Sequence, residues 1–332
     1  MKKIFLGTVF IILFSSAFSQ SFVIDSSRNP LVHTFSIVAR DSITGEMGVA
    51  VQSHWFSVGS IVGWAEAGVG AVATQSLVNP SFGMRGLELL KKGKTAKETV
   101  EELIASDSGS AFRQLAIVDA KGNAFSYTGK NCIPEAGNII GRSFSVQANL
   151  MLNDKVPAAM EKVFKASKGP LAERMIAALE AAQTVGGDIR GQQSASLLVV
   201  KGVSSGKIWE DKLIDLRVED NSQPIQELKR LLKVYRAYEH MNNGDLATEK
   251  GDWETAIKEY GEAEKMFPDN IEMKFWHAVN LVNKGKTEDA LPLFKTIFAK
   301  EKNWLILLPR LRKVGLLSTD DATVKKILEI GN

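Results

Sequence analysis

The sequence predicts an α+β protein in two parts: a four-layer sandwich of two antiparallel sheets with helices outside, followed by an all-helical repeat domain. Three observations predict this architecture. Between residues 34 and 220, strand-like segments are grouped with strands and helical segments with helices, which is typical of α+β folds. Beyond Pro224 the strand signal stops and the hydrophobic period becomes helical. Within this helical part, residues 224–332, similar residues recur 34 positions apart.

The N-terminal segment has the pattern of a signal peptide. Lys2 and Lys3 form a positive start, residues 4–14 are an almost continuous apolar run, and Ala17-Phe18-Ser19 supplies small residues for a cleavage site. The apolar run is short for a membrane span, which favours a cleaved leader over a retained anchor. We therefore expect residues 1–19 to be removed during export to the periplasm or the cell exterior.

The charge and the cysteine and histidine content exclude several function classes. Loss of the leader lowers the formal charge from +3 to +1, which leaves no broad field for nucleic acid or anionic lipid. Cys132 is the single cysteine and cannot form an intramolecular disulfide; without a histidine motif beside it, a structural thiol is favoured over a nucleophile. The histidines are scattered, so neither a metal nor another cofactor is predicted. They are His33, His54, His240 and His277.

The first half of the sandwich is predicted from alternation and turn chemistry. Every second residue from Phe35 to Ala39 is apolar and would lie on one face: Phe35, Ile37 and Ala39. This period of two residues is that of a pleated strand, which we expect to begin at Thr34. Turn residues at 41–45 lead into a returning strand. The strands expected here are 34–40, 47–53 and 68–76.

The second half of the sandwich begins with two helices and continues with strands. The second helix is announced by a capping box, in which Thr95 is followed three residues later by Glu98. A hairpin turning at Lys121-Gly122-Asn123 follows. The remaining expected elements are strands at 114–119, 124–128, 143–148, 194–201 and 207–218, and helices at 158–167 and 171–184.

The helical part contains an internal repeat of 34 residues. Small residues that let helices approach, and an aromatic residue that fills the groove between them, recur at this spacing: Gly251 with Gly285, Ala256 with Ala290, and Tyr260 with Phe294. The pattern resembles the tetratricopeptide repeat, with units 237–270 and 271–304 and a capping stretch after them. The first unit also has Gly244, Ala263 and Pro268 at the family's places, whereas the second has Ile297 and Lys302 instead of Ala and Pro. A protein or peptide is the ligand expected for such repeats.

Thr34 is the candidate nucleophile. N-terminal nucleophile hydrolases begin with such a residue at the start of a strand: its side-chain oxygen attacks a carbonyl and its own α-amine serves as base. That chemistry requires Thr34 to be the first residue of the mature chain. Residues 20–33 would then form a propeptide removed by cleavage between His33 and Thr34, and the threonine could perform this cleavage itself. On the pattern alone, a threonine that begins a strand is usually an ordinary β-branched strand residue.

A set of motifs stands in a fixed order along the first part of the chain: 34–41, 45–53, 67–75, Asn79-Pro80 with Gly83, 85–87, 132–134, 145–147 with Asn149, Gly187-Asp188, Arg190-Gly191 and 193–195. This set resembles one bacterial family, the domain-of-unknown-function family 1028, placed in the N-terminal nucleophile hydrolase superfamily. The resemblance covers residues 34–220 and implies the αββα fold and an amidohydrolase activity. Some members have a C-terminal segment associated with peptidoglycan binding, in place of which this chain has the helical repeats.

Polar residues at strand ends are candidates for the supporting roles. Asn149, Gln75 and Asn79 could donate to a developing oxyanion, although strand-end and turn capping would explain them equally well. Ser53 ends the second strand, where it could contact the threonine amine. Asp188 and Arg190 could orient that amine, or form a structural ion pair. Asn79 and His54 are assigned to substrate binding. Because the sequence has no lysine between Thr34 and Lys91, the α-amine is favoured as base over a proteasome-style lysine.

The resulting hypothesis is an exported amidohydrolase that cleaves an amide bond in a small amide, a peptide or a cell-wall fragment. The alternative is a catalytically inactive sandwich that serves, with the helical repeats, as a binding or scaffold protein. A different nucleophile, Ser21, would be exposed if the leader were cut after Gln20, but no strand pattern surrounds it. Assembly into a homo-oligomer is left open.

Overall fold

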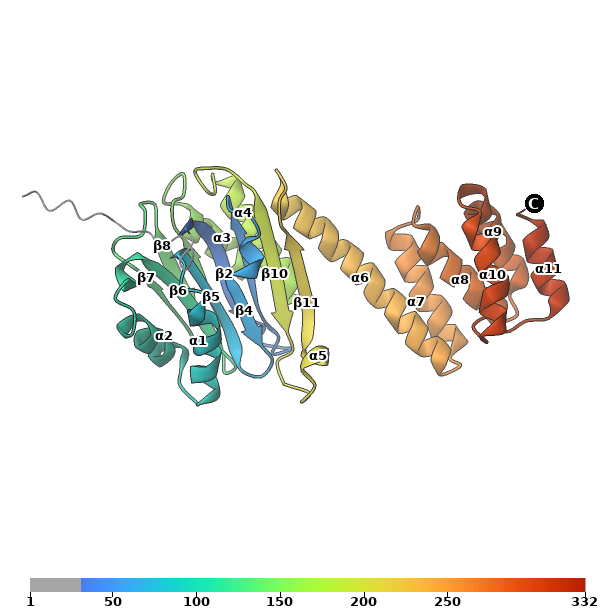
Figure 1. Ribbon diagram of the computed structural model, residues 1–332, viewed down its shortest axis with the longest axis horizontal. Helices are drawn as coiled ribbons and strands as arrows, with labels where there is room; N and C mark the ends of the chain where they lie inside the picture. The colour runs from blue at the N-terminus through green and yellow to red at the C-terminus, as the bar shows by residue number, and fades with distance from the viewer. Residues whose placement is uncertain (1–30, 332) are drawn as a thin grey trace, which may run out of the picture.

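The computed structural model describes residues 31–331. The expected signal peptide, residues 1–19, and residues 20–30 of the expected propeptide lie outside the described residues. In Figure 1 the strands form one body, and the long helix α6 (Pro224–Glu249) leads from it to a separate group of helices. Within residues 31–331, no helix combines the length and apolar character needed to cross a membrane.

All described strands belong to two antiparallel sheets. The first sheet has the order β1-β5-β6-β7, with β4 also paired to β5, and the second has the order β11-β10-β3-β2-β9-β8. The strands of the first sheet are β1 (Leu31–Val32), β4 (Gly63–Glu66), β5 (Gly70–Leu77), β6 (Arg113–Asp119) and β7 (Ala124–Thr128). Those of the second are β2 (Thr34–Arg40), β3 (Met47–Ser53), β8 (Gly137–Gly141), β9 (Phe144–Ala148), β10 (Ser194–Val200) and β11 (Lys212–Val218).

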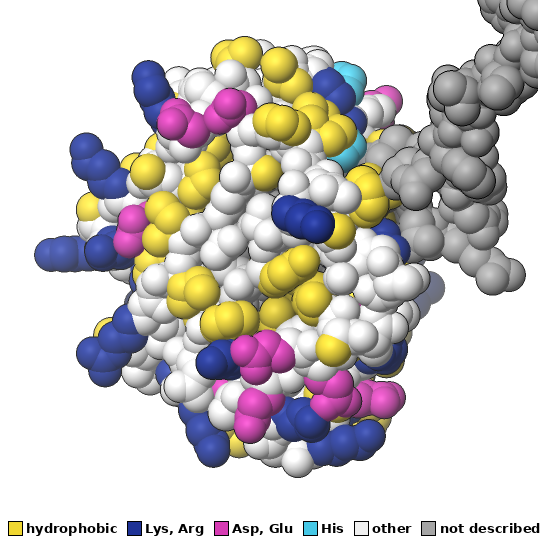
Figure 2. Space-filling view, turned by 90° about the vertical axis from the view of Figure 1, so that its left-hand side faces the viewer, with side chains coloured by type: hydrophobic (Ala, Val, Ile, Leu, Met, Phe, Trp, Pro, Cys, Tyr) yellow, Lys and Arg dark blue, Asp and Glu magenta, His cyan; other side chains and the backbone are white. Residues whose placement is uncertain are grey.

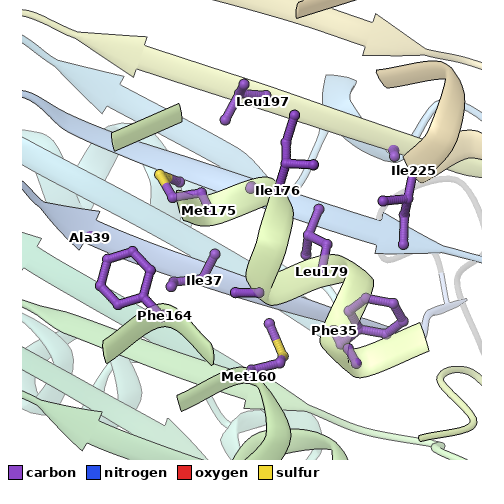
Figure 3. Packing of buried hydrophobic residues seen from close by; sticks show 14 of the residues in the cluster. Phe35, Ile37, Ala39, Met160, Phe164, Met175, Ile176, Leu179, Leu197 and Ile225 are labelled. Atoms are coloured by element: carbon purple, nitrogen blue, oxygen red, sulfur yellow. The ribbon is translucent and has the colours of Figure 1, made fainter. Parts of the chain in front are cut away.

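Strand β2 lies in the middle of the second sheet, and its two faces differ in character. Phe35, Ile37 and Ala39 pack into a core shared with α3 (Val156–Ala166) and α4 (Leu171–Thr184). Figure 3 shows the aromatic and aliphatic side chains of this core between strand and helices. The opposite face of β2 turns toward the first sheet, and there Val38 packs with the apolar residues of that sheet. The alternation seen in the sequence thus reflects two different buried environments.

The remaining helices of this body cover the first sheet. Helices α1 (Ser81–Lys91) and α2 (Ala96–Ala105) pack their apolar residues against β5, β6 and β7. The capping box is present: the Thr95 side chain accepts from the backbone N–H of Glu98, and the Glu98 side chain accepts from the backbone N–H of Thr95. Because the two reciprocal bonds satisfy two donors that a helix start leaves unpaired, they fix where α2 begins.

The prediction of two antiparallel sheets followed by a helical region is confirmed. The expected continuous strand at 207–218 is wrong over its first part, because α5 (Ile208–Asp211) precedes β11. Asp211 accepts hydrogen bonds from the Ser204 hydroxyl and the backbone N–H of Ser205, and this local turn replaces strand pairing. Three short strands, β1, β4 and β8, were not expected from the sequence.

The helix α6 belongs to both bodies. Its first turns bury Ile225, Leu228 and Leu232 in the core of the sandwich beneath the second sheet. The Tyr235 hydroxyl donates to the backbone carbonyl of Leu213 on β11 at 2.5 Å. Farther along, α6 packs against α7 (Trp253–Met266), so one rigid helix connects the two hydrophobic cores. The helices that follow are α8 (Ile271–Asn283), α9 (Thr287–Lys300), α10 (Asn303–Lys313) and α11 (Asp321–Glu329).

The residues that recur at 34 positions occupy equivalent places in two successive helix pairs. Gly251 and Gly285 follow α6 and α8 with φ of +69° and +78°, a left-handed conformation in which glycine is favoured. Ala256 and Ala290 are fully buried, and so are the aromatic rings at the third repeated position. A Cβ atom at Gly244 would lie 2.8 Å from the ring of Tyr260, so glycine allows this ring to reach α6.

Replacement of the buried Ala256 by Trp should destabilise the helical region. Ala256 shares a small core with α6 residues, and an indole there has no space without displacing α7 from α6. We expect Ala256→Trp to lower the free energy of unfolding by about 1–3 kcal/mol, measured by urea denaturation. Ala322→Trp, at an exposed position of α11, is the matched control and should change it little. Equal stability of the two variants would contradict this packing.

Candidate active site

The candidate site lies at one edge of the second sheet, where β2 begins and where β3 and β9 end. Thr34, the first residue of β2, pairs with Ser53, the last residue of β3, and both are fully buried. Asn149 directly follows β9, and its backbone N–H donates to the carbonyl oxygen of Thr34 at 3.1 Å. The sheet register therefore brings together three of the residues that the sequence singled out.

The carbonyl oxygen of His33 accepts two hydrogen bonds from side chains. The Ser53 hydroxyl donates to it at 2.6 Å, and Nη2 of Arg190 donates to it at 2.8 Å. This carbonyl belongs to the peptide bond between His33 and Thr34. Two donors on one carbonyl oxygen, one of them charged, polarise that bond more strongly than an ordinary sheet hydrogen bond does.

Asp188 fixes the direction of the Arg190 guanidinium. Nε and Nη2 of Arg190 donate to the two carboxylate oxygens of Asp188 at 3.0 and 2.7 Å, a bidentate pair. The Asp188 side chain is fully buried and also accepts from the backbone N–H groups of Arg190 and His54. Four donors therefore surround this buried carboxylate and satisfy its hydrogen-bonding capacity. The ion pair positions the guanidinium over the His33 carbonyl.

The His33 imidazole is held against Asn149. Its Nδ1 lies 2.9 Å from Oδ1 of Asn149, which makes Nδ1 the protonated nitrogen that donates. Burial, together with the nearby Arg190 cation, lowers the pKa of His33 below its usual value, although Asn149 and Asp188 act in the opposite direction. The ring is therefore neutral at neutral pH.

A network of buried amides fills the space between the two sheets beside Thr34. Nε2 of Gln75 donates to the Thr34 carbonyl at 3.2 Å and to Oε1 of Gln114 at 2.7 Å. The same Oε1 accepts from Nδ2 of Asn149 at 2.9 Å. Ser36 donates to Gln75 and accepts from Gln147, both at 2.6 Å. Such connected and satisfied networks are rigid, and this one holds the backbone of Thr34 in place.

Apolar side chains are exposed next to this site. Backbone hydrogen bonds connect Leu150 to Ile133 and Ile189, and Leu152 to Gly187, so three loops lie side by side. On these loops Ile133, Leu152 and Ile189 are 37%, 56% and 55% exposed. Figure 2, which views the end of the sandwich opposite the C-terminal helices α7–α11, shows several hydrophobic side chains exposed on the surface of the sandwich.

Two residues highlighted by the sequence are not part of this network. Asn79 accepts from the backbone N–H of Ser81 at the start of α1 and donates to Asp107, which is a capping role. Cys132 is buried, and burial raises the pKa of its thiol, which leaves little thiolate at neutral pH. His54 contributes its backbone N–H to Asp188, whereas its Nδ1 is buried without a hydrogen-bond partner.

The described residues 31–331 contain no group of three or more His, Cys, Asp or Glu side chains arranged to hold a metal ion. The chemistry available at the site is that of a hydroxyl, a guanidinium, a carboxylate and amides. These groups can polarise a carbonyl and stabilise an oxyanion.

Comparison with known proteins places this arrangement in a family. The sequence matches a family of unknown function, DUF1028, over residues 34–228. The chain belongs to the DUF1028 family. Its match ends within α6, at Leu228, in agreement with the packing of that turn on the sandwich. A search among curated proteins gives no match.

Solved structures include another member of the family. The crystal structure of protein SPO2555 from Silicibacter pomeroyi, described as DUF1028, is 30% identical with a TM-score of 0.55, and the match covers 60% of this chain and 85% of that one. Anbu (ancestral beta-subunit) from Yersinia bercovieri is 13% identical with a TM-score of 0.31, over 59% of this chain and 92% of that one. The second likeness is too weak to assign a fold.

The sequence did not single out several residues of this DUF1028 site. Gln114 joins Gln75 to Asn149, although its position at the start of a strand gives no signal of that role. The His33 side chain was considered only as the residue before the cleavage point, and its contact with Asn149 joins positions 116 residues apart. A polar residue on the inward face of a strand, as at Ser36 and Gln147, is the one sequence signal that could have found this network.

Proposed function

We propose that this DUF1028 protein is an exported amidohydrolase of the N-terminal nucleophile type, with Thr34 as the nucleophile. In this proposal the two sheets and the helices on them form the four-layer αββα sandwich of that superfamily, and residues 20–33 are a propeptide. The helices after α6 are proposed to be tetratricopeptide-like repeats that bind a protein or peptide. The proposal rests on one observation above all, the double hydrogen bond to the His33 carbonyl.

That observation supports self-cleavage because it matches what the reaction requires. When the Thr34 hydroxyl attacks the His33 carbonyl carbon, negative charge develops on the carbonyl oxygen. Ser53 and Arg190 already donate to this oxygen at 2.6 and 2.8 Å, so they are placed to stabilise the oxyanion. A peptide bond with no chemical role would not need a charged donor, the half-buried Arg190, that is itself fixed by a buried carboxylate.

The proposed reaction conserves atoms without a cofactor. Oγ of Thr34 forms an ester bond to the His33 carbonyl carbon as the bond from that carbon to the Thr34 nitrogen breaks. The hydroxyl proton ends on this nitrogen, which becomes the free α-amine. Water then hydrolyses the ester, releasing the His33 carboxylate and restoring the Thr34 hydroxyl. The new amine can act as base when the hydroxyl attacks a substrate amide.

The surroundings of Thr34 favour a fixed nucleophile after this cleavage. Its carbonyl oxygen accepts from the Asn149 backbone N–H at 3.1 Å and from Gln75 at 3.2 Å, and neither bond involves His33. The strand pairing of Thr34 with Ser53 also survives loss of the preceding residues. Ser53 and Arg190 would then be available to the carbonyl oxygen of a substrate in the place that the His33 carbonyl occupied.

The exposed apolar residues beside the site favour a substrate with an apolar acyl group. Ile189 stands between Asp188 and Arg190 in the sequence and is 55% exposed. Ile189→Ser should raise KM for amides with a large apolar acyl group about tenfold and leave cleavage of a small acetyl amide unchanged. The matched control is Ile43→Ser, at an exposed residue in the turn at the opposite end of β2. Equal effects on both amides would contradict this specificity.

The N-terminus of the exported protein tests the proposed function. Intact mass and N-terminal sequencing of active protein should show that the mature chain begins at Thr34. Fully active protein that begins at Gln20 would refute the threonine-amine mechanism. Uncut protein that hydrolyses no amide in a panel would instead support the inactive scaffold.

A further inference from the structure

A second concave site lies at the other end of β2, away from Thr34. Arg40 ends this strand six residues after Thr34, and a rise of about 3.3 Å per residue separates the two ends by about 20 Å. Two adjoining cavities of about 270 and 240 Å³ lie there and share Arg142, Phe164 and Arg174 in their walls. Figure 3 shows Phe164 next to Ala39, near this end of the strand.

The walls of these cavities carry an excess of positive charge. Arg40, Arg142 and Arg174 line them, and Asp41 is the carboxylate paired with this group, through Nη1 of Arg174 at 2.9 Å. Burial alone would raise the pKa of Asp41, but backbone N–H donors from the following turn and the Arg174 cation outweigh it and lower the pKa. Asp41 is therefore ionised. Lys165, at the margin, is offset by Glu161 at 3.5 Å, so two positive charges remain uncompensated.

The arginine side chains at these cavities have N–H donors that make no hydrogen bond in the described part of the chain. Nε of Arg40 and Nε of Arg174 are buried and have no hydrogen-bond partner among the described residues. The exposed side chain of Arg142 has neither an ion pair nor a hydrogen bond within the same residues. Buried donors without partners are unfavourable, and three arginines that approach one another repel. An anion in the cavities would relieve both effects.

The site is held in shape by contacts that do not involve a ligand. The Arg174 guanidinium lies over the Phe164 ring at 4.6 Å, and this ring packs against Phe144 at 4.9 Å. The backbone N–H of Arg40 donates to the carbonyl of Ser143, which ties the end of β2 to the turn that carries Arg142. The Arg174 guanidinium and the backbone that carries Arg40 and Arg142 are therefore preorganised, which lowers the entropic cost of binding.

We propose that these cavities bind a dianionic phosphoryl group of a soluble molecule. Planar guanidinium groups bind phosphate oxygens in a bidentate manner, and two uncompensated positive charges match a phosphate dianion. The position of Phe164 and Phe144 in the wall leaves an apolar surface for the remainder of the ligand. This site is independent of the proposed hydrolase chemistry, because none of its residues belongs to the network around Thr34.

Calorimetric titration with inorganic phosphate tests this site. At constant ionic strength, set with sodium chloride, wild-type protein should bind phosphate saturably with one site per chain. Arg142→Gln should weaken binding about tenfold or more, because it removes a charge-assisted contact. Arg142 has no side-chain partner among residues 31–331, so the melting temperature without phosphate should stay unchanged. Arg310→Gln, at an exposed arginine of α10, is the matched control and should bind as wild type does.

Three outcomes would overturn the proposal. The first is equal phosphate affinity of Arg142→Gln and wild type. The second is heat that depends on ionic strength alone and does not saturate. The third is binding to vesicles that contain phosphatidic acid without any response to inorganic phosphate, which would show a membrane contact in place of a soluble ligand.

Discussion

Thr34→Ala should leave residues 20–33 attached and abolish amide hydrolysis. The methyl group has no oxygen to attack the His33 carbonyl carbon, and the uncut peptide nitrogen has no lone pair available as a base. The expected loss is complete within the sensitivity of the assay, because nucleophile and base disappear together. Intact mass measures the processing, and release of amine from an amide panel measures the activity.

Thr34→Ser is the control for this substitution. It keeps the hydroxyl, so it should retain partial processing and partial hydrolysis. Both variants keep the strand register of Thr34 with Ser53 and the backbone bond from Asn149, and we expect both to fold. Far-ultraviolet circular dichroism should be the same for wild type and both variants. Processing of Thr34→Ala at the wild-type rate would show that another protease removes the segment.

The fold could be predicted to the extent that each element has a local signal. Strand β2 alternates between two buried faces, and α2 has its capping box, so both follow from periodicity and side-chain chemistry. The strands β4 and β8 are short and half-buried, and β8 contains a glycine at each end, so their pairing depends on partners distant in the sequence. The α5 turn could not be predicted either, because it depends on hydrogen bonds to Asp211. The alternation of apolar and polar residues in the sequence does not reveal such bonds.

The sequence predicted which residues lie at the candidate site better than it predicted the contacts that each of them makes. Thr34, Ser53 and Asn149 all stand at the ends of strands, and strand ends meet at one edge of a sheet. The sequence suggested that Ser53 contacts the threonine amine of the cleaved chain; in the uncut chain its hydroxyl donates to the His33 carbonyl. It suggested Asn149 as an oxyanion donor; in the uncut chain its side-chain amide joins His33 to Gln114. These choices depend on side-chain rotamers, which no local pattern determines.

The position of α6 shows a further limit of sequence reasoning. The change of period at Pro224 predicts a boundary between domains, and the helix does begin there. However, Ile225, Leu228 and Leu232 are buried in the sandwich, so hydrophobic contact continues across the change of period. The period of the hydrophobic residues shows that a segment is helical. It does not show in which hydrophobic core the apolar face of that helix is buried.

Ser53→Ala should slow self-cleavage of the precursor, residues 20–332, about 10²–10³-fold, the effect of losing one oxyanion donor, or about 2.7–4 kcal/mol of barrier. The serine hydroxyl donates to the His33 carbonyl at 2.6 Å, and Arg190 would remain as the other donor. The rate is measured by intact mass over time after refolding. Ser126→Ala is the matched control, because Ser126 is also a buried serine on a strand and its hydroxyl has no hydrogen-bond partner among the described residues.

This experiment separates a chemical role of the two donors from a structural one. If Ser53 and Arg190 only stabilise the loop, Ser53→Ala would lower the melting temperature but leave the cleavage rate of the folded precursor equal to that of the control. If they stabilise the oxyanion, the rate falls at temperatures where all three proteins are folded. Addition of Arg190→Gln to Ser53→Ala should then slow cleavage further, because the developing charge on the His33 carbonyl oxygen would have no side-chain donor left.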